Sequence, residues 1–322
     1  MAPCEGHIDA HQPPPNLIRT LYKTYRKLKP ADYESDANII DLQKTLAGLK
    51  IIRTIPKDQL LDICSTFINN SGGGDNGILK DSKSFAASAS DVHVYEHEAL
   101  PEGEPSTLLS EHSAASSNLS FFSCAPDSAP LFIPKDTVHH KPINITEFLG
   151  KRFRWVTLGG QYDWTNKVYP PEEPPAFPED IKQLLQRCFP DMRPEAAIVN
   201  SYSPGDTLSM HRDVSEYCDQ GLISISLGCD ALFIIGYECG EEDKSAEGQT
   251  IKKLVIRLHS GDTVYMTKKA RFAWHGVPRI IPNTCPLWME HWPASMGRSN
   301  YEAWRGWMSN KRINLNVRQM KE

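Results

Sequence analysis

Short runs of alternating apolar and polar residues dominate the second half of the chain. They predict strands, several of them bounded by glycine, over residues 197–202, 222–227, 231–235, 253–258, 262–266 and 271–275. Residues 178–188 instead repeat apolar side chains at helical spacing, with Ile181, Leu184 and Leu185 on one face. Short strands joined by turns are typical of two packed sheets, so we expect a double-stranded β-helix core, a jelly-roll variant of mixed β structure with flanking helices.

The first 130 residues show different patterns. Leucine and isoleucine recur at helical intervals over residues 16–68, which predicts an N-terminal helical extension spanning residues 1–68. Residues 69–130 are rich in Gly, Ser, Asn and Ala, a composition typical of a low-complexity linker or insert. We therefore divide the chain into the extension, the linker and a main domain over residues 131–322.

Residues 312–318 alternate strictly between polar and apolar side chains. In a strand, one face would carry Arg312, Asn314, Asn316 and Arg318, and the opposite face Ile313, Leu315 and Val317. By the same rule, Asn200 and Tyr202 share a face. Arginine supplies forked, permanently charged donors, which suit a dicarboxylate co-substrate. An Arg/Asn strand by itself is more often a solvated edge.

His211 and Asp213 are two residues apart in a segment that we expect to be extended, so both side chains can reach one ion. His275 follows from a later predicted strand. Two histidines and one carboxylate on a single face of a metal leave open positions that suit Fe(II) and O2. A lone His-x-Asp is rarely a metal site, but here it lies in one domain with the Arg/Asn strand. Together these motifs predict an Fe(II)- and 2-oxoglutarate-dependent oxygenase.

The motifs resemble those of the AlkB family of nucleic-acid dealkylating dioxygenases. The resemblance runs from about residue 152 to residue 318, and it is most similar to the homologue-one branch in residues 152–159, 274–279 and 312–319. Residues 21–30 also resemble the beginning of that branch. The resemblance implies that residues 131–322 form a dioxygenase domain with a nucleotide-recognition lid near residues 151–170.

The resemblance also implies roles for the polar residues. Fe(II) would be held by His211, Asp213 and His275. The distal carboxylate of 2-oxoglutarate would pair with Arg312, helped by Tyr202 and Asn314, and its metal-chelating end would be supported by Asn200 and Arg318. Arg318 would in addition steady Asp213. With O2, the reaction would yield succinate and CO2 and hydroxylate an N-methyl group that is lost as formaldehyde.

The lid carries the residues that the resemblance assigns to the substrate. A base taken out of its stack needs aromatic faces, and phosphates need basic side chains. The candidates are Trp155, Tyr162, Trp164, Ser215, Arg152 and Arg154. The alternative that Trp155 and Tyr162 are core aromatics stays open. Ser215 stands where bacterial members tend to carry an acidic residue, and residues 159–162 depart from the usual Gly-Tyr-x-Tyr, so the modified base stays open.

Composition limits the partners and the compartment. The net charge of −5 means that any contact with DNA or RNA depends on local basic groups, of which we favour residues 151–154 over residues 19–29. Eight cysteines without a CxxC pair indicate a reducing compartment rather than a zinc ribbon or disulfide scaffold. There is no long apolar run and no signal or Arg-rich transit pattern. We expect a monomer in the nucleus and cytoplasm, without membrane contact, and a mitochondrial pool stays open.

Other functions remain as alternatives. The chain could be a non-catalytic nucleic-acid-binding or sensing protein on a retained oxygenase scaffold. It could also be a protein-directed dioxygenase, since the homologue-one branch is associated with histone demethylation and AP-site cleavage. The sequence leaves open DNA or RNA, DNA repair or tRNA modification, and the roles of residues 69–130 and of the Trp-rich insert 284–308, for which we favour a packed flap.

Overall fold

The computed structural model describes residues 9, 12–29, 32–44, 49–55, 92–97, 121–127, 132–133, 137–163, 168–238, 251–297 and 299–321. Its strands are β1 (Ile39–Asp41), β2 (Leu49–Ile55), β3 (Val92–His97), β4 (Trp155–Gly159), β5 (Ala196–Tyr202), β6 (Leu208–His211), β7 (Leu222–Gly228), β8 (Ala231–Glu238), β9 (Ile251–Leu258), β10 (Thr263–Met266), β11 (Trp274–Ile280) and β12 (Arg312–Arg318). Its helices are α1 (Asn16–Lys27), α4 (Ile145–Glu147) and α5 (Glu179–Cys188), with a π-helical turn η3 (Phe148–Arg152). Short 3-10 helices are η2 (Phe121–Ser123), η5 (Lys268–Ala270), η6 (Ala294–Met296), η7 (Ser299–Trp304) and η8 (Trp307–Asn310).

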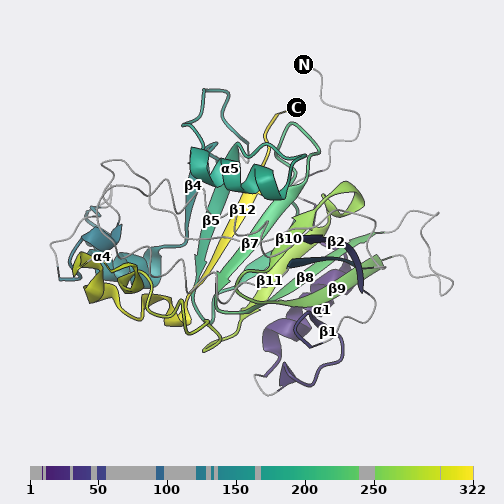
Figure 1. Cartoon of the computed structure of the whole chain (residues 1–322), viewed down its shortest axis with the longest axis horizontal. Coiled ribbons are helices and arrows are strands. Elements are labelled where there is room, and N and C mark those ends of the chain that lie inside the picture. The colour runs from purple at the N-terminus through teal and green to yellow at the C-terminus, as the bar shows by residue number, and fades with distance from the viewer. Residues whose placement is uncertain are drawn as a thin grey trace.

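Two five-stranded sheets form the body of the molecule (Figure 1). The major sheet has the order β10-β7-β12-β5-β4 and the minor sheet the order β1-β9-β8-β11-β6. All pairings in them are antiparallel except that of β1 with β9. This arrangement confirms the predicted double-stranded β-helix core. The predicted strands and the helix at residues 178–188 appear as β5, β7 to β11 and α5, although β11 begins at Trp274 because η5 and a turn occupy the residues before it.

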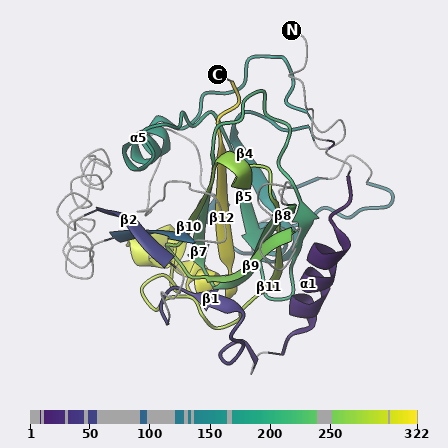
Figure 2. The same cartoon turned by 90° about the vertical axis from the view of Figure 1, so that its right-hand side faces the viewer.

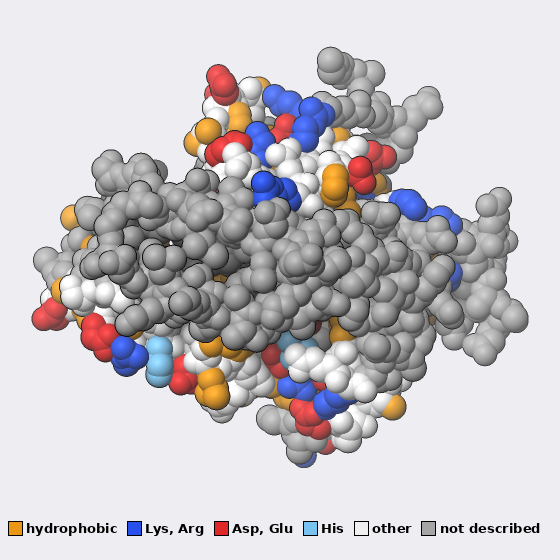
Figure 3. Space-filling model, viewed as in Figure 1, with side chains coloured by type: hydrophobic (Ala, Val, Ile, Leu, Met, Phe, Trp, Pro, Cys, Tyr) orange, Lys and Arg blue, Asp and Glu red, His pale blue; other side chains and the backbone are white. Residues whose placement is uncertain are grey.

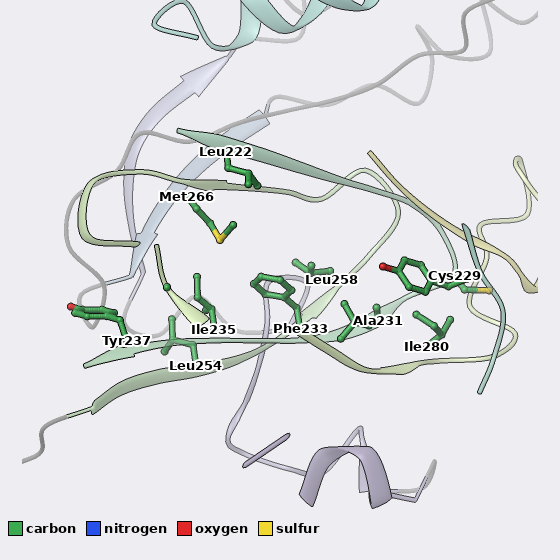
Figure 4. Close-up of a cluster of buried hydrophobic side chains, with 13 residues drawn as sticks. Leu222, Cys229, Ala231, Phe233, Ile235, Tyr237, Leu254, Leu258, Met266 and Ile280 are labelled. Carbon is green, nitrogen blue, oxygen red and sulfur yellow. The ribbon is translucent and has the colours of Figure 1, made fainter. Parts of the chain in front are cut away.

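Apolar side chains from both sheets meet between them. Figure 4 shows Phe233 and Leu258 of the minor sheet opposite Leu222 and Met266 of the major sheet, and all four are buried. The Phe233 ring lies 6.0 Å from the ring of His275, so this core adjoins the predicted metal ligands. A well-packed interior of this kind holds both sheets at a fixed separation.

A helix covers the outer face of each sheet, and the two helices lie on opposite sides of the molecule (Figure 2). On the major sheet, Leu184 and Leu185 of α5 pack on a cluster that includes Leu315 and Val317 of β12. On the minor sheet, α1 buries Ile18, Tyr22 and Tyr25 against β8, β9 and β11. Both helices are amphipathic, with three buried apolar positions each.

The expectation of helix throughout residues 16–68 is wrong for the described residues between Leu28 and Ile55, and residues 56–68 lie outside the described part of the chain. Leu28 has an extended backbone, and Pro30 shortly after it cannot continue a helix. The chain then contributes β1 to the minor sheet, parallel to β9, and β2 pairs with β3. Strand β3 lies inside the predicted linker, most of which falls outside the described residues. The division of the chain into extension, linker and main domain stays a prediction.

The Trp-rich insert packs as an aromatic cluster with η2, α4 and η3. Phe122 contacts the rings of Trp292, Trp304 and Trp307 at centroid distances of 5.0, 5.8 and 4.9 Å. Trp288 is exposed instead. No described helix is both long enough and apolar enough to cross a bilayer.

Candidate metal and co-substrate site

The three predicted metal ligands come together at the edge of the minor sheet. Strands β6 and β11 are antiparallel neighbours with His211 directly opposite His275, and the two rings are 4.3 Å apart. Asp213 follows β6, and its carboxylate oxygens lie 3.7 Å from Nε2 of His211 and 3.6 Å from Nε2 of His275. One ligand atom from each residue therefore falls within 4.8 Å of the others. Among the described residues this is the one such group of three.

A glycine allows the two ligand strands to approach closely. A side chain at Gly276, next to His275, would meet the carbonyl oxygen of Leu208 at 2.9 Å and the sulfur of Met210 at 2.9 Å. Backbone at that distance cannot move aside without disturbing the β6–β11 pairing. The His-Gly order in the sequence thus has a steric reason.

Backbone carbonyls fix the orientation of both imidazoles. Nδ1 of His211 lies 2.9 Å from the carbonyl oxygen of Ser209, and Nδ1 of His275 lies 3.0 Å from that of Ala273. A carbonyl only accepts, so each Nδ1 carries the proton and each Nε2 presents its lone pair. Nε2 of His275 is buried and has no hydrogen-bond partner among the described residues. These are the tautomers that bind a metal through Nε2, and they fit Fe(II).

The charges of His211 and Asp213 also suit a cation. Burial, with the neighbouring His275, lowers the pKa of His211 to about 4, so its imidazole is neutral near pH 7. Burial acts to raise the pKa of Asp213, but the Arg318 guanidinium and the two imidazoles outweigh it and hold the pKa well below its ordinary value. His211 therefore offers a neutral nitrogen and Asp213 an ionised carboxylate. The side chain of His211 is 33 % exposed and that of His275 only 4 %, so the site opens on the His211 side.

The centre of the major sheet forms a buried polar cradle. In its register Tyr202 lies opposite Arg312 and Asn200 opposite Asn314, on the face that points toward the minor sheet. The Arg312 guanidinium lies 5.6 Å from the Tyr202 ring and donates one hydrogen bond, of 2.9 Å, to Oγ of Ser226. Its Nε and Nη1 atoms, and the Tyr202 hydroxyl, are buried without partners in the described structure. Burial raises the pKa of Tyr202 to about 12, so that hydroxyl keeps its proton and can donate.

These unpartnered donors fit the distal carboxylate of 2-oxoglutarate. Leaving a buried charged donor unsatisfied is unfavourable, and a carboxylate would satisfy both Arg312 and Tyr202. Asn314 differs from our expectation, because its amide already donates to Oγ of Ser224 at 2.9 Å and to the carbonyl of Ile225 at 3.0 Å. Its amide therefore donates within the sheet in this structure, and its contact with the co-substrate stays a prediction.

A chain of buried ion pairs holds the Asp213 carboxylate. Nη2 of Arg318 lies 2.9 Å from Oδ2 of Asp213, and Nε of Arg318 lies 3.1 Å from Oε1 of Glu216. Arg271 contacts the other Glu216 oxygen at 2.8 Å and donates to the Asp213 carbonyl at 2.8 Å. Asn316 adds a hydrogen bond of 3.4 Å to Asp213 Oδ2. Arg318 thus steadies Asp213, as expected.

Sequence reasoning missed three members of this network, namely Glu216, Arg271 and Asn316. Glu216 and Arg271 are 55 residues apart and meet only because η5 and the turn after it bring Arg271 beneath the metal segment. Asn316 could have been found, because it shares a strand face with Arg312 and Arg318.

Two of the predicted substrate residues meet at the rim of the site. The hydroxyls of Tyr162 and Ser215 are 3.2 Å apart, which links the lid to the metal segment. The Tyr162 ring also packs edge-on against Tyr169 at 5.3 Å, and the Tyr169 hydroxyl accepts a bond of 3.4 Å from Arg318. Tyr162 is therefore partly a packing residue. Trp164 lies outside the described residues.

Trp155 is not a core aromatic. It begins β4, lies opposite Asn200 on the cradle side of the major sheet, and is 43 % exposed. Its substrate role stays a prediction.

Two of the three basic residues at positions 151–154 already have acidic partners. Arg152 lies 3.4 Å from Glu147, and Arg154 lies 2.5 Å from Asp206. On the face shown in Figure 3, basic and acidic side chains are mixed, without a broad positive surface among the residues drawn in colour. Contact of residues 151–154 with phosphate stays a prediction, in which Arg152 and Arg154 would have to exchange an acidic partner for a phosphate.

Comparison with known proteins agrees with this geometry. The sequence profile of the 2OG-Fe(II) oxygenase superfamily matches residues 107–318. The chain belongs to this superfamily, and it is a dioxygenase that uses Fe(II), 2-oxoglutarate and O2.

Its relatives include nucleic-acid demethylases. The chain is 40 % identical to the N6-methyladenosine RNA demethylase of Pyricularia oryzae over 98 % of each chain. It is 53 % identical to the N6-methyladenosine RNA demethylase of Cryphonectria parasitica over 66 % of this chain and 95 % of that one. It is also 44 % identical to the tRNA demethylase of Schizosaccharomyces pombe over 56 % of this chain and 57 % of that one. These relatives confirm the predicted likeness to the homologue-one branch of the AlkB family.

Proposed function

We propose that this dioxygenase removes N-methyl groups from nucleic-acid bases, with N6-methyladenine in RNA as the first substrate to test. One observation carries the proposal: the His211–Asp213–His275 group faces a buried cradle whose Arg312 and Tyr202 donors lack partners among the described residues. The names of the relatives from Pyricularia oryzae and Cryphonectria parasitica support the choice of base and of RNA. The products are the demethylated base, formaldehyde, succinate and CO2.

In this proposal each residue has a limited task. His211, Asp213 and His275 would hold Fe(II), which supplies the activation of O2 when bound. Arg312 and the Tyr202 hydroxyl bind the distal carboxylate of 2-oxoglutarate, while the surrounding sheet excludes water from it. Arg318 holds the Asp213 carboxylate in place by the 2.9 Å ion pair, so the ligand set keeps its shape as substrates enter and leave.

The substrate side of the site combines one exposed ring with uncharged polar groups. Trp155 is partly exposed on the cradle side of the major sheet, where a base that has left its stack would enter. The paired hydroxyls of Tyr162 and Ser215 can each donate or accept at the edge of that base. This arrangement supports a base as the target rather than a charged peptide side chain.

The exposed face of α1 supports contact with a phosphate backbone. Residues 16–29 contain no acidic residue, and five exposed basic side chains are distributed along them: Arg19, Lys23, Arg26, Lys27 and Lys29. None of these five forms an ion pair with another described side chain, in contrast to Arg152 and Arg154. Unpaired cations on one face are what a polyanion requires.

Product analysis tests the proposal. Anaerobically iron-loaded protein would be supplied with 2-oxoglutarate and O2 and offered RNA oligonucleotides, tRNA, single-stranded DNA and duplex DNA, each with and without N6-methyladenine. We expect formaldehyde in a one-to-one ratio with succinate on a methylated RNA and neither product on its unmethylated counterpart. If iron-loaded protein released no formaldehyde from any of these substrates, the proposal would be wrong. Succinate formed without formaldehyde would then direct the search to a protein substrate.

A further inference from the structure

The outer face of the two ligand strands carries a second set of contacts, directly behind the metal group. His211 and His275 point toward the cradle, so their neighbours Arg212 and Trp274 point away from it. The Arg212 guanidinium lies 4.5 Å from the centre of the Trp274 ring. Trp274 is buried and Arg212 is partly buried, so the ring side of the guanidinium is shielded while its outer edge faces water. A cation over an aromatic ring is attracted by the electrons of the ring face.

The segment before α1 covers the same place. Nη2 of Arg212 donates to the carbonyl of Asp9 at 3.2 Å and to Oε1 of Gln12 at 2.7 Å. Below them, the fully buried Ile18 of α1 packs with Trp274 and Met210. The described N-terminal residues therefore reach Arg212 from one side while Trp274 holds it from the other.

We propose that Arg212 is a positioning residue for the metal centre. It lies between the ligands His211 and Asp213 in the chain, and its partner Trp274 immediately precedes the third ligand, His275. Asp213 lies beyond the end of β6, so sheet hydrogen bonds of that strand do not place it. The Arg212–Trp274 contact fixes the backbone around all three ligands, and the N-terminal residues complete it.

The chemistry requires arginine in this position. Its planar guanidinium can lie flat on an indole ring while its edge donates to two oxygen acceptors. Lysine keeps the charge but cannot make the flat contact and both hydrogen bonds together. Arg212→Lys is therefore expected to resemble Arg212→Met rather than the parent protein.

Metal binding without turnover tests the proposal. Co(II) would be titrated into Arg212→Met and Arg212→Lys protein in competition with a chromogenic chelator, and the absorption spectrum of bound Co(II) recorded. We expect the Kd for Co(II) to rise about three- to tenfold, the scale of losing one partly exposed cation–π contact. We also expect the spectrum to change, because the ligand geometry loosens. Gln12→Ala, which removes only the 2.7 Å contact, should raise the Kd by a smaller factor.

Arg279→Met is the matched control. Arg279 also lies on β11 and ties it to the N-terminal residues, through the Arg26 carbonyl and a position 5.9 Å from the Tyr33 ring. It therefore reports the general effect of loosening α1, and its Co(II) Kd and spectrum should match those of the parent protein. The proposal fails if Arg212→Met binds Co(II) like the parent, or if Arg279→Met weakens binding equally. Either outcome is independent of whether the protein demethylates RNA.

Discussion

At the residue scale, Arg312 is buried with two guanidinium nitrogens that lack a partner among the described residues. The same is true of the Tyr202 hydroxyl. The Asp213 carboxylate, in contrast, is already held by Arg318 and Asn316. The Arg312 and Tyr202 donors can therefore bind the carboxylate of a co-substrate, whereas the metal group already contains the carboxylate of Asp213. Substitutions in these two parts of the site should therefore have different kinetic effects.

Arg312→Ala should mainly weaken 2-oxoglutarate binding. Loss of charge-assisted hydrogen bonds corresponds to a KM for 2-oxoglutarate raised about 10- to 100-fold, with Co(II) binding unchanged. Asp213→Ala removes the one anionic ligand and should abolish both metal binding and turnover. Steady-state kinetics with varied 2-oxoglutarate distinguish the two. Comparable activity in both variants would contradict these assignments.

Glu216→Gln should destabilise the protein even though Glu216 does not face the cradle directly. Its side chain is 3 % exposed and lies between the Arg318 and Arg271 guanidinium groups. Neutralising it leaves buried positive charge uncompensated, which should lower the free energy of unfolding by about 3 kcal/mol. Urea denaturation measures this, with Glu302→Gln as control, because the Glu302–Arg305 pair is exposed and its loss should be undetectable. Equal stability of the two variants would show that the network is dispensable.

At the element scale, β1 is joined to the core through a buried histidine. Nε2 of His259 lies 3.0 Å from Asp41 of β1, and its Nδ1 lies 3.0 Å from Asp230, beside β8. Burial acts to lower the pKa of His259, but hydrogen bonds and charge from Asp230 and Asp41 outweigh it and raise the pKa above 6.5. Both ring nitrogens can donate only while the ring is protonated.

The stability of this junction should depend on pH. Because the folded-state pKa is the higher one, the stabilisation is fully present below about pH 6 and is lost as pH rises through the folded-state pKa. We expect the difference in unfolding free energy between the parent protein and His259→Gln to shrink from pH 6 to pH 9. Urea denaturation across that range measures it. A difference that stays constant or grows with pH would contradict the assignment of a protonated His259.

The basic face of α1 should contribute to RNA affinity in a salt-dependent way. Lys23→Ala combined with Lys27→Ala should weaken RNA binding and lower the slope of log Kd against log salt concentration by about 2. The control is Arg154→Ala, whose charge Asp206 already neutralises, and which should change the slope less. Fluorescence anisotropy at several salt concentrations gives both slopes. If Arg154→Ala lowered the slope more than the Lys23 and Lys27 double variant, the lid residues would be the main phosphate contact.

The sequence predicted those elements whose burial has a local period. Strand β12 alternates because one face meets α5 and the other lines the cradle, and α5 repeats at helical spacing for the same reason. Strand β1 lies in the stretch that local spacing predicts as helix. It is a strand because it pairs with β9, more than 200 positions away, as in Ile39 with Val255. Such long-range pairing overrides local spacing.

In the site, too, local spacing could be read from the sequence and long-range contacts could not. His211 with Asp213, and Asn200 with Tyr202, are separated by two residues, so strand geometry was enough to place them together. The Glu216–Arg271 pair and the Arg212–Trp274 contact depend on packing between distant segments. Pattern alone could not find them, and it also could not show that Arg152 and Arg154 have acidic partners.

At the scale of the whole molecule, the minor sheet carries the metal ligands and the major sheet carries the cradle. Each sheet is backed by its own helix, α1 or α5 (Figure 2). The Asp213–Arg318 pair is an ionic contact that joins the two halves across the interior. Fe(II) and 2-oxoglutarate, bound together, would add a second connection between them.

Because the two sheets carry different parts of the site, the supply of Fe(II) and 2-oxoglutarate should affect the lifetime of the protein as well as its turnover rate. A ligand that binds only when both sheets are packed together stabilises the folded state by mass action. When the cell is short of iron or 2-oxoglutarate, the sheets should separate more often and expose interior segments to proteases. The abundance of the protein would then follow the metabolic state of the cell without any change in its synthesis.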